Sequence, residues 1–144
     1  EVFATNSLVI AVPKGQDTIS SLADLADPSL VVVLCAPEVP CGAASATALT
    51  NAGVEVTPAS LEQNVTAVLT KVQAGEADAG LVYRTDQAAA DGVDAVDDEH
   101  LDAVVNSYPI GALAGAEDDA QVFVDFVLSD AGQSVLAEWG FGAP

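Results

Sequence analysis

The sequence predicts an α/β fold in which helices flank a mostly parallel central sheet. The continuous apolar run Leu30–Leu34 is typical of a strand that is covered on both faces. Apolar residues then recur at the spacing of one helix face, at Val65, Val68, Leu69 and Val72. Strands and helices alternate through this region, and such alternation favours parallel pairing with right-handed crossovers.

The first half of the chain supplies an entry segment and two helices around the buried strand. Val2–Val12 is expected to be extended and to end in a strand. Ser20–Leu25 is expected to be a short helix. After the buried strand, the alanine-rich segment Gly42–Thr50 predicts a helix with Pro40 near its first turn and Gly53 at its end.

The middle of the chain adds a second helix and a strand that ends in a tyrosine. Val54–Val56 is expected to be a brief strand, and Ser60–Gln63 has the form of a capping box that begins the helix ended by Gly75. The stretch Asp78–Asp86 predicts a buried strand that carries Tyr83 to its carboxyl end, where α/β sheets bind ligands. A tyrosine that only packs is the alternative.

The last third of the chain is acidic and then helical. The carboxylates of Asp91–Asp102 lack the glycine and the alternation of a calcium loop, so a solvated acidic face is expected. Val104–Leu113 is expected to return as a strand, and Ala116–Leu128 and Asp130–Glu138 as helices.

The first of these two helices is apolar on more than one side. Ala120, Phe123, Val124 and Val127 form one face, whereas Val122 and Phe126 lie on another at 100° per residue. The sequence therefore predicts either that this domain wraps the helix completely or that a partner surface covers it.

Length and charge narrow the function classes. The 144 residues suit one domain, and a hydrophobic content of 51% is unlike that of disordered chains. Three basic residues against 22 acidic ones give a net charge of −19, which excludes nucleic acid and anionic membranes as partners and indicates adaptation to high salt. No apolar run is long enough to span a bilayer, and the first residues do not resemble a signal peptide, so an exported protein would have lost its targeting segment.

Cys35 and Cys41 enclose five residues, a spacing that matches no zinc pattern, and His100 is the only histidine. The two prolines between the cysteines make a stiff loop that suits a short disulfide in an exported protein. Two reduced, buried thiols in a cytosolic protein are the alternative.

The sequence offers little to a catalyst and more to an anion. It has no nucleophile–base pairing and no phosphate-binding glycine loop, so an enzyme is not expected, and neither is a cofactor. Helix amino ends near Pro40–Gly42 and near Asn64-Val65 carry free N–H groups and partial positive charge. Together with the Tyr83 hydroxyl, they predict a neutral cradle for a small oxyanion at the carboxyl edge of the sheet.

Six segments carry a resemblance to a known family: Phe3–Asn6, Ala11–Gly15, Ser21–Leu25, Cys35–Gly42, Gly75–Tyr83 and Gly140-Phe141. Together they resemble the molybdate-binding proteins of ABC uptake systems. The resemblance runs over essentially all 144 residues and covers the second half of the family pattern.

The resemblance implies one lobe of a type II periplasmic-binding fold, which holds molybdate or tungstate through N–H groups and hydroxyls. Carried over by motif, Cys41 and Val65 would each donate a backbone N–H and Tyr83 its hydroxyl, and these would be the contacts to the metal oxyanion. The family's two serine ligands lie in a first lobe that these residues do not include. Ser7 and Ser60 are not their equivalents.

The resemblance also implies an organisation and partners. Residues 1–113 would form the ligand-binding lobe, with hinge-crossing strands at both ends, and residues 114–144 a helical segment that packs on the first lobe. Expected partners are the small oxyanion, a membrane permease, and the first lobe or a second copy of the chain. The expected location is extracytoplasmic, in the periplasm or on the cell surface, where a lipid anchor in the full precursor is one option.

Other readings stay open. A ligand-sensing domain of a regulator uses the same fold, and another anion such as sulfate would suit the same donors. A hydrolase or thiol oxidoreductase is a third reading. The double substitution Cys35→Ser, Cys41→Ser would exclude this third reading if the variant still bound the oxyanion and the unaltered chain showed no turnover.

Overall fold

A computed structural model describes residues 1–144, and the chain divides into two compact units. The sheet unit comprises Ser7–Val104, and the ribbon unit comprises Glu1–Asn6 with Val105–Pro144. No helix of either unit is both long and apolar enough to cross a membrane. The division predicted from the sequence, 1–113 and 114–144, stays a prediction, and the contacts instead group both ends of the chain in the ribbon unit.

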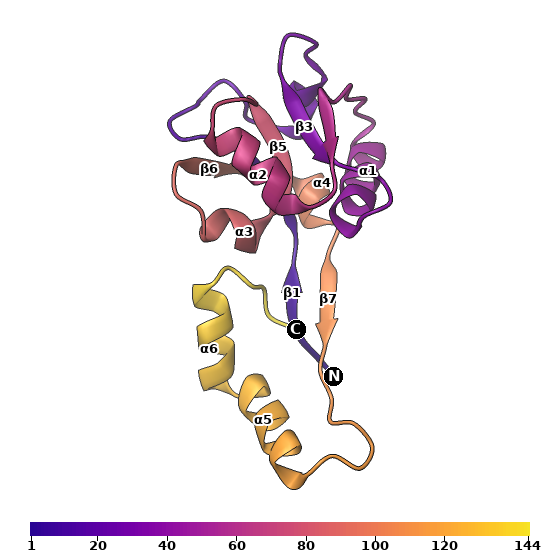
Figure 1. Cartoon of the computed structure of the whole chain (residues 1–144), viewed down its shortest axis with the longest axis vertical. Coiled ribbons are helices and arrows are strands. Elements are labelled where there is room, and N and C mark those ends of the chain that lie inside the picture. Colours follow the sequence, from indigo (N-terminus) through magenta and orange to yellow (C-terminus); the bar gives the residue numbers. More distant parts are fainter. The chain divides into compact units, whose positions relative to one another are not determined.

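The sheet unit is built on a five-stranded mixed sheet in the order β4-β3-β5-β2-β6. Figure 1 labels three of these strands, β3, β5 and β6. The strands are β2 (Leu8–Pro13), β3 (Val32–Cys35), β4 (Ser60–Glu62), β5 (Ala79–Tyr83) and β6 (Val93–Val96). Strand β3 runs parallel to β4 and β5, whereas β2 runs antiparallel to both β5 and β6. The predicted α/β class is therefore confirmed, and β2 is the one strand that makes the mostly parallel sheet a mixed one.

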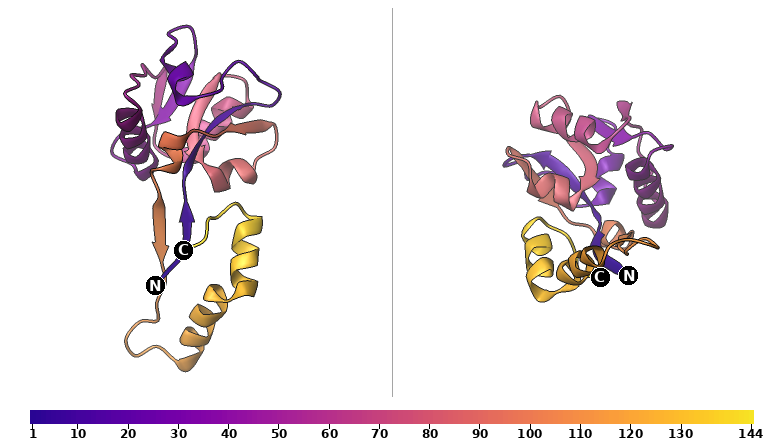
Figure 2. Two further views of the ribbon diagram at one scale, coloured as in Figure 1. Left: turned by 180° about the vertical axis from the view of Figure 1, so that it is seen from behind. Right: turned by 60° about the horizontal axis from the view of Figure 1, so that its bottom comes forward.

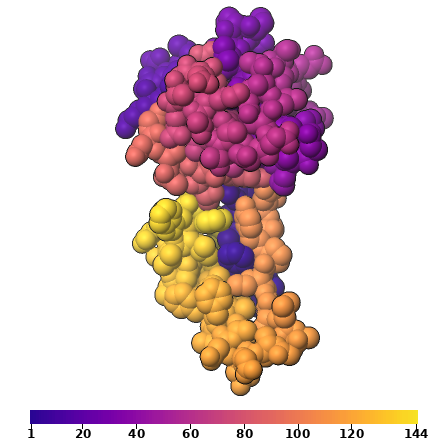
Figure 3. Space-filling model, in the orientation of Figure 1, coloured from indigo at the N-terminus to yellow at the C-terminus, as the bar shows by residue number.

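Both faces of this sheet are buried, as the apolar run in β3 predicted. Leu8, Ile10 and Val12 of β2 pack into one cluster, and Val9 and Ala11 pack into the cluster on the opposite face. The first cluster is completed by the short 3-10 helix η1 (Leu22–Ala26), α1 (Pro40–Ala52) and α4 (Glu99–Asp102), and the second by α2 (Val65–Gln73). Figure 2 shows the elements of this unit from two further directions, and Figure 3 shows one face of its surface.

The helix ends follow from local chemistry. Pro40 is the first residue of α1, and Gly53 ends that helix in the left-handed conformation with φ 65°. Asn64 caps α2 by accepting a hydrogen bond from the Ala67 N–H at 2.9 Å. The short helix α3 (Arg84–Ala88) follows β5 directly. The starts of α1 and α2 were predicted to within a few residues, whereas the Asn64 cap was not predicted and α3 begins inside the stretch Asp78–Asp86 that was predicted as a strand.

The segment before α2 was predicted wrongly. Ser60–Glu62, which has the form of a capping box, is the edge strand β4, and Val54–Val56 is not a strand. The Ser60 hydroxyl donates to Glu62 at 2.6 Å rather than capping a helix. A Ser-x-x-Gln pattern is therefore compatible with a capping box and also with an edge strand whose polar side chains form hydrogen bonds to one another.

The acidic segment Asp91–Asp102 exposes Asp91, Asp97, Glu99 and Asp102, as the expected solvated face predicts, but it also contains regular structure. It contains β6 and α4, and Leu101 is fully buried. Asp98 accepts hydrogen bonds from the backbone N–H of Leu22 at 2.8 Å and of His100 at 2.9 Å. Burial alone would raise the pKa of Asp98, but these donors outweigh it and hold the pKa below its usual value.

The ribbon unit consists of two strands and two helices. Strand β1 (Val2–Asn6) pairs antiparallel with β7 (Asn106–Pro109), and the helices are α5 (Asp118–Leu128) and α6 (Asp130–Glu138). The carboxyl-terminal tail closes this unit, because Thr5 and Gly142 exchange backbone hydrogen bonds at 2.8 and 2.9 Å. The predicted extended segment Val2–Val12 is thus two strands that part at Ser7.

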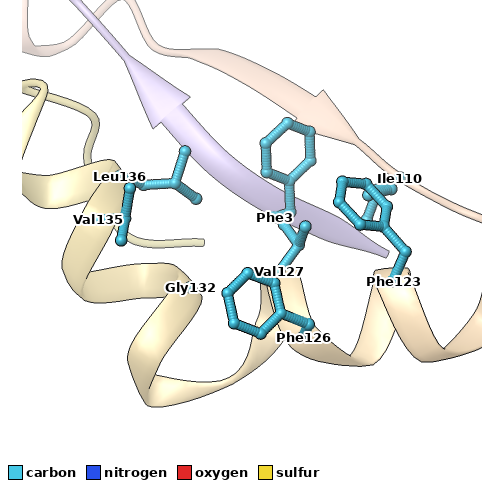
Figure 4. Close-up of a pocket in the computed structure, with 8 residues that line it drawn as sticks. All are labelled: Phe3, Ile110, Phe123, Phe126, Val127, Gly132, Val135 and Leu136. Atoms are coloured by element: carbon cyan, nitrogen blue, oxygen red, sulfur yellow. The ribbon is translucent and has the colours of Figure 1, made fainter.

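The ribbon unit leaves an apolar face uncovered. Phe123 is 61% exposed and Phe126 is 54% exposed, whereas Val124 on the same helix is buried. Residues of the two helices and β1, together with Ile110, line a hollow of about 310 Å³ (Figure 4): Phe3, Ile110, Phe123, Phe126, Val127, Gly132, Val135 and Leu136. The unit therefore does not wrap α5 completely, and the other alternative, that a partner surface covers the helix, stays a prediction.

Candidate functional site

Three parallel strands of the sheet unit end at one edge. Cys35, the last residue of β3, is paired with Glu62, the last residue of β4. Val33 is paired with Gly80, so continuing the register places Cys35 level with Val82, next to Tyr83. Because helices α1, α2 and α3 follow these strands, their amino ends also lie at this edge. This is the edge at which open α/β sheets bind ligands.

The loop from β3 to α1 is closed by a disulfide between Cys35 and Cys41. The disulfide reading of the two cysteines is therefore confirmed, and neither cysteine is free. Ala36, in the loop, donates its N–H to the Glu62 carbonyl at 2.8 Å and so ties this loop to the end of β4. The N–H of Cys41 donates to no group of the chain. Unpaired N–H groups in the first turn of a helix are available to an anion.

Gly42 lets the first turn of α1 lie directly on this loop. A Cβ at Gly42 would lie 1.9 Å from the Ala36 carbonyl oxygen, which is far inside contact distance. Only glycine fits such a close backbone approach. The sequence motif Cys41-Gly42 thus has a steric reason that the spacing of residues did not reveal.

The start of α2 is the second donor site. Val65 is the first residue of this helix, and its N–H donates to no group of the chain. The segment before it is fixed by Glu62, which forms an ion pair with Lys71 of α2 at 2.5 Å. The Lys71 ammonium and the Ser60 hydroxyl lower the pKa of Glu62. The Asn64 cap was not predicted, although asparagine just before a periodic apolar run is a known signal for the start of a helix.

Tyr83 is the third predicted site residue. It ends β5, and its backbone position is fixed because the next N–H, that of Arg84, donates to the Ser7 carbonyl at 2.9 Å. The ring packs against the clusters on both faces of the sheet, and its hydroxyl is shielded from solvent. Packing, the alternative interpretation, is therefore part of its role.

The structure brings the predicted residues together on the sheet unit. Cys41 lies in the apolar cluster under α2, and Val65 and Tyr83 border that same cluster. All three come from the carboxyl edge of the three parallel strands. The strand register therefore places all three residues at the same edge of the sheet.

No basic side chain is left to attract an anion to this edge. Arg84 is paired with Asp97 at 2.7 Å, and Lys71 with Glu62. Lys14 lies far from this edge. It follows Pro13, the last residue of β2, whereas Leu8, the first residue of β2, is the one that pairs with Tyr83. Burial raises the pKa of Asp86 in the first turn of α3. The chemistry available at the edge is that of uncharged donors.

The sequence profile described as "Bacterial extracellular solute-binding protein" matches residues 1–142. The chain belongs to this family. The resemblance predicted from its six motifs is confirmed by the relatives found, of which one, "Molybdate-binding protein ModA" of Mycobacterium bovis, is 42% identical over 99% of this chain. A second relative, the "Putative ABC transporter substrate-binding lipoprotein YvgL" of Bacillus subtilis, is 30% identical over 96% of this chain.

A solved structure of a related protein agrees with this family assignment. The "substrate binding domain of putative molybdenum ABC transporter" from Clostridium difficile matches with a TM-score of 0.85 and 26% identity, over 100% of this chain and 66% of that chain. This family member therefore has the fold of type II periplasmic-binding proteins. It spans 56% of the length of the two curated relatives, about half of each.

Proposed function

We propose that this chain takes part in binding a tetrahedral oxyanion, molybdate or tungstate, as a substrate-binding component of an ABC uptake system. The donors would be the N–H groups of Cys41 and Val65 and the hydroxyl of Tyr83. The observation that supports the proposal is the placement of these three groups at one sheet edge, with two N–H groups that donate to nothing in the chain.

Uncharged donors suit this class of anion. Molybdate and tungstate are fully ionised at neutral pH, so each of their oxygens accepts hydrogen bonds. A protonated anion such as hydrogen phosphate would bring a donor that meets no acceptor, at a cost of about 1–3 kcal/mol. Sulfate remains a second candidate, because it has the same charge and shape.

The relatives favour transport over catalysis or sensing. Of those described above, two are named as substrate-binding parts of ABC transporters and one as a molybdate-binding protein, and no enzyme is among them. We therefore propose that the chain is not an enzyme, that the oxyanion is its ligand rather than a cofactor, and that it acts outside the cytoplasm with a membrane permease. A sensing domain of a regulator is the second candidate.

The ribbon unit supports a further polypeptide partner. Its helix α5 exposes 61% of Phe123 and 54% of Phe126 beside an apolar hollow, and neighbouring exposed apolar side chains of this kind mark interaction surfaces. We propose that the first lobe of the family fold covers this face. A second copy of the chain is the alternative. A hydrophobic dye should bind the 144 residues alone and be excluded when the first lobe is supplied, whereas a monomer that binds no dye would contradict the proposal.

Calorimetric titration with molybdate, tungstate and sulfate tests the function, with the first lobe absent and supplied. Val65→Pro is the decisive variant, because it deletes one N–H donor at the first helical position, where proline is tolerated. Each hydrogen bond to a charged group is worth about 1.5–3 kcal/mol, so affinity should fall roughly tenfold to a hundredfold.

Matched controls separate the donor from the fold. Val65→Ala keeps the N–H and should keep the affinity, and Asp118→Pro makes the same change at the first residue of α5. Tyr83→Phe should weaken binding, whereas Tyr108→Phe, in β7, should not. Equal affinity of Val65→Pro, Tyr83→Phe and the unaltered chain would contradict the proposed donors, and no binding of any oxyanion in either arm would contradict the function.

A further inference from the structure

The loop between β3 and α1 has nearly every backbone donor committed. Pro37 and Pro40 have no N–H to donate. Four other residues of the loop and first helical turn donate to backbone carbonyls: Ala36, Val39, Gly42 and Ala43. The remaining N–H groups belong to Glu38, which is exposed, and Cys41, which is 4% exposed. The loop thus leaves a single buried donor, and it is the one assigned above to the oxyanion.

The disulfide is attached to that same residue. It joins Cys35, at the end of the rigid central strand β3, to Cys41, the second residue of α1. Both cysteines are buried in the cluster with Val33, Val68 and Val82. The first turn of a helix frays readily because its N–H groups have no intrahelical partners. A covalent link to the strand removes this freedom at the donor.

We infer that the Cys35–Cys41 disulfide is a positioning element for the Cys41 N–H, and that opening it weakens oxyanion binding while the sheet unit stays folded. This inference depends on the proposed function. The fold should persist because Ala36 remains bonded to Glu62 and Gly42 remains packed on the Ala36 carbonyl. The affinity should fall because the strength of a hydrogen bond drops steeply as its angle departs from linear.

The test is the double variant Cys35→Ala, Cys41→Ala, which removes both sulfur atoms and leaves the Cys41 N–H in place. Its molybdate affinity, measured by calorimetry, should be about tenfold weaker than that of the unaltered chain, a part of the loss expected for deleting the donor. Reduction of the unaltered chain by a phosphine should have the same effect, since the phosphine is oxidised to its oxide with the oxygen of one water molecule and the disulfide takes up two electrons and two protons to give two thiols.

The matched control is Ala48→Gly, a destabilising change in the buried middle of α1. Each protein is titrated at the same interval below its own Tm, so that general loosening of α1 contributes equally. Hydrogen exchange should be faster at residues 36–43 in the double variant and unchanged at residues 65–73. A double variant that binds as tightly as the unaltered chain, or no more weakly than Ala48→Gly, would overturn the inference.

The positioning role of the disulfide and the proposed function can fail separately. If the oxidised chain binds molybdate and the double variant binds it equally well, only the positioning role is lost. If the oxidised chain binds no oxyanion with the first lobe supplied, the proposed function fails and the inference fails with it.

Discussion

The two units of the molecule bury their apolar side chains to very different extents. The sheet unit has apolar clusters on both faces of its sheet, and its large core side chains, such as Leu81, are fully buried. In the ribbon unit Val124 and Ala4 are the buried apolar residues, and more than half of the surface of Phe123 and of Phe126 is exposed. The same chain therefore contains one unit with a core of its own and one without.

This difference separates what each unit contributes. A sheet covered on both faces holds its edge rigidly, which suits a site made of backbone N–H groups that no side-chain rearrangement can reposition. An exposed aromatic face instead gains free energy only when another surface covers it, at about 25 cal/mol for each Å² of apolar area removed from water. Under the proposed function, recognition of a small anion and docking of a polypeptide would thus fall to different units.

The largest expected effect comes from truncating one large apolar residue in each unit. Leu81→Ala should lower the free energy of unfolding by about 2–5 kcal/mol, because it leaves a cavity in a closed core. Phe123→Ala should change it by no more than about 0.5 kcal/mol, because most of the ring is already in water. Urea unfolding of both variants measures the contrast. Similar losses in the two would show that the ribbon unit has a core after all.

A smaller effect is expected from adding one methyl group to a glycine of each unit. Gly42→Ala should cost about 1–3 kcal/mol, because the new Cβ would overlap the Ala36 carbonyl oxygen and push α1 off its loop. Gly111→Ala, in the ribbon unit, has open space around the new Cβ and should be neutral. Thermal unfolding compares the two, and an unchanged Tm for Gly42→Ala would refute the close approach described above.

Much of the sheet unit was predictable because its signals are local. The apolar run of β3, the helical period of α2 and the strand that ends at Tyr83 all appear at the predicted places. Parallel succession then placed the helix starts at one edge, since each follows a strand. The site residues could be proposed from this order and from the family motifs without any knowledge of side-chain packing.

What the sequence did not reveal depends on contacts between distant residues. Strand β4 is held by pairing with β3 and by the Glu62–Lys71 ion pair, and neither is visible in the letters of Ser60–Glu62. Strand β6 lies in an acidic run because it pairs with β2 at the edge of the sheet. The reversed direction of β2 could not be predicted from the sequence either, because side chains alternate between the two faces of a sheet in the same way whichever direction the strand runs.

Acid should affect the sheet unit through an ion pair that the ribbon unit cannot form. The pKa of Glu62 is lowered, chiefly by the Lys71 ammonium, so the pair stabilises the fold above the ordinary glutamate pKa of about 4.3 and loses its contribution as the pH falls through the lower, folded-state value. Lys71→Met should therefore be less stable than the unaltered chain at pH 7 and should converge with it in acid. Denaturant unfolding from about pH 7 to pH 3 measures this.

The control for the ion pair is Lys14→Met, which removes the same charge from a lysine with no carboxylate partner. It should show no convergence in acid. A Lys71→Met difference that is the same at every pH would assign the effect to lost side-chain packing rather than to charge.

The smallest expected effect is that of salt, and it should favour the ribbon unit. All three basic side chains lie in the sheet unit, whereas the charged side chains of the ribbon unit are all acidic: Glu1, Glu117, Asp118, Asp119, Asp125, Asp130 and Glu138. Added KCl screens this repulsion, and because the Debye length falls from about 10 Å at 0.1 M to about 3 Å at 1 M, most of the gain should be complete below 1 M.

Hydrogen exchange as a function of KCl resolves the two units. Protection in α5 and α6 should rise more than protection in β3 and β5. Screening relieves charge repulsion in both units, but in the sheet unit it also weakens ion pairs such as Glu62–Lys71. Sucrose, which strengthens apolar burial without screening charge, is the control and should act on both units alike. A salt response that continues to grow beyond 1 M, or that is larger in the sheet unit, would mean that apolar burial rather than charge repulsion limits the ribbon unit.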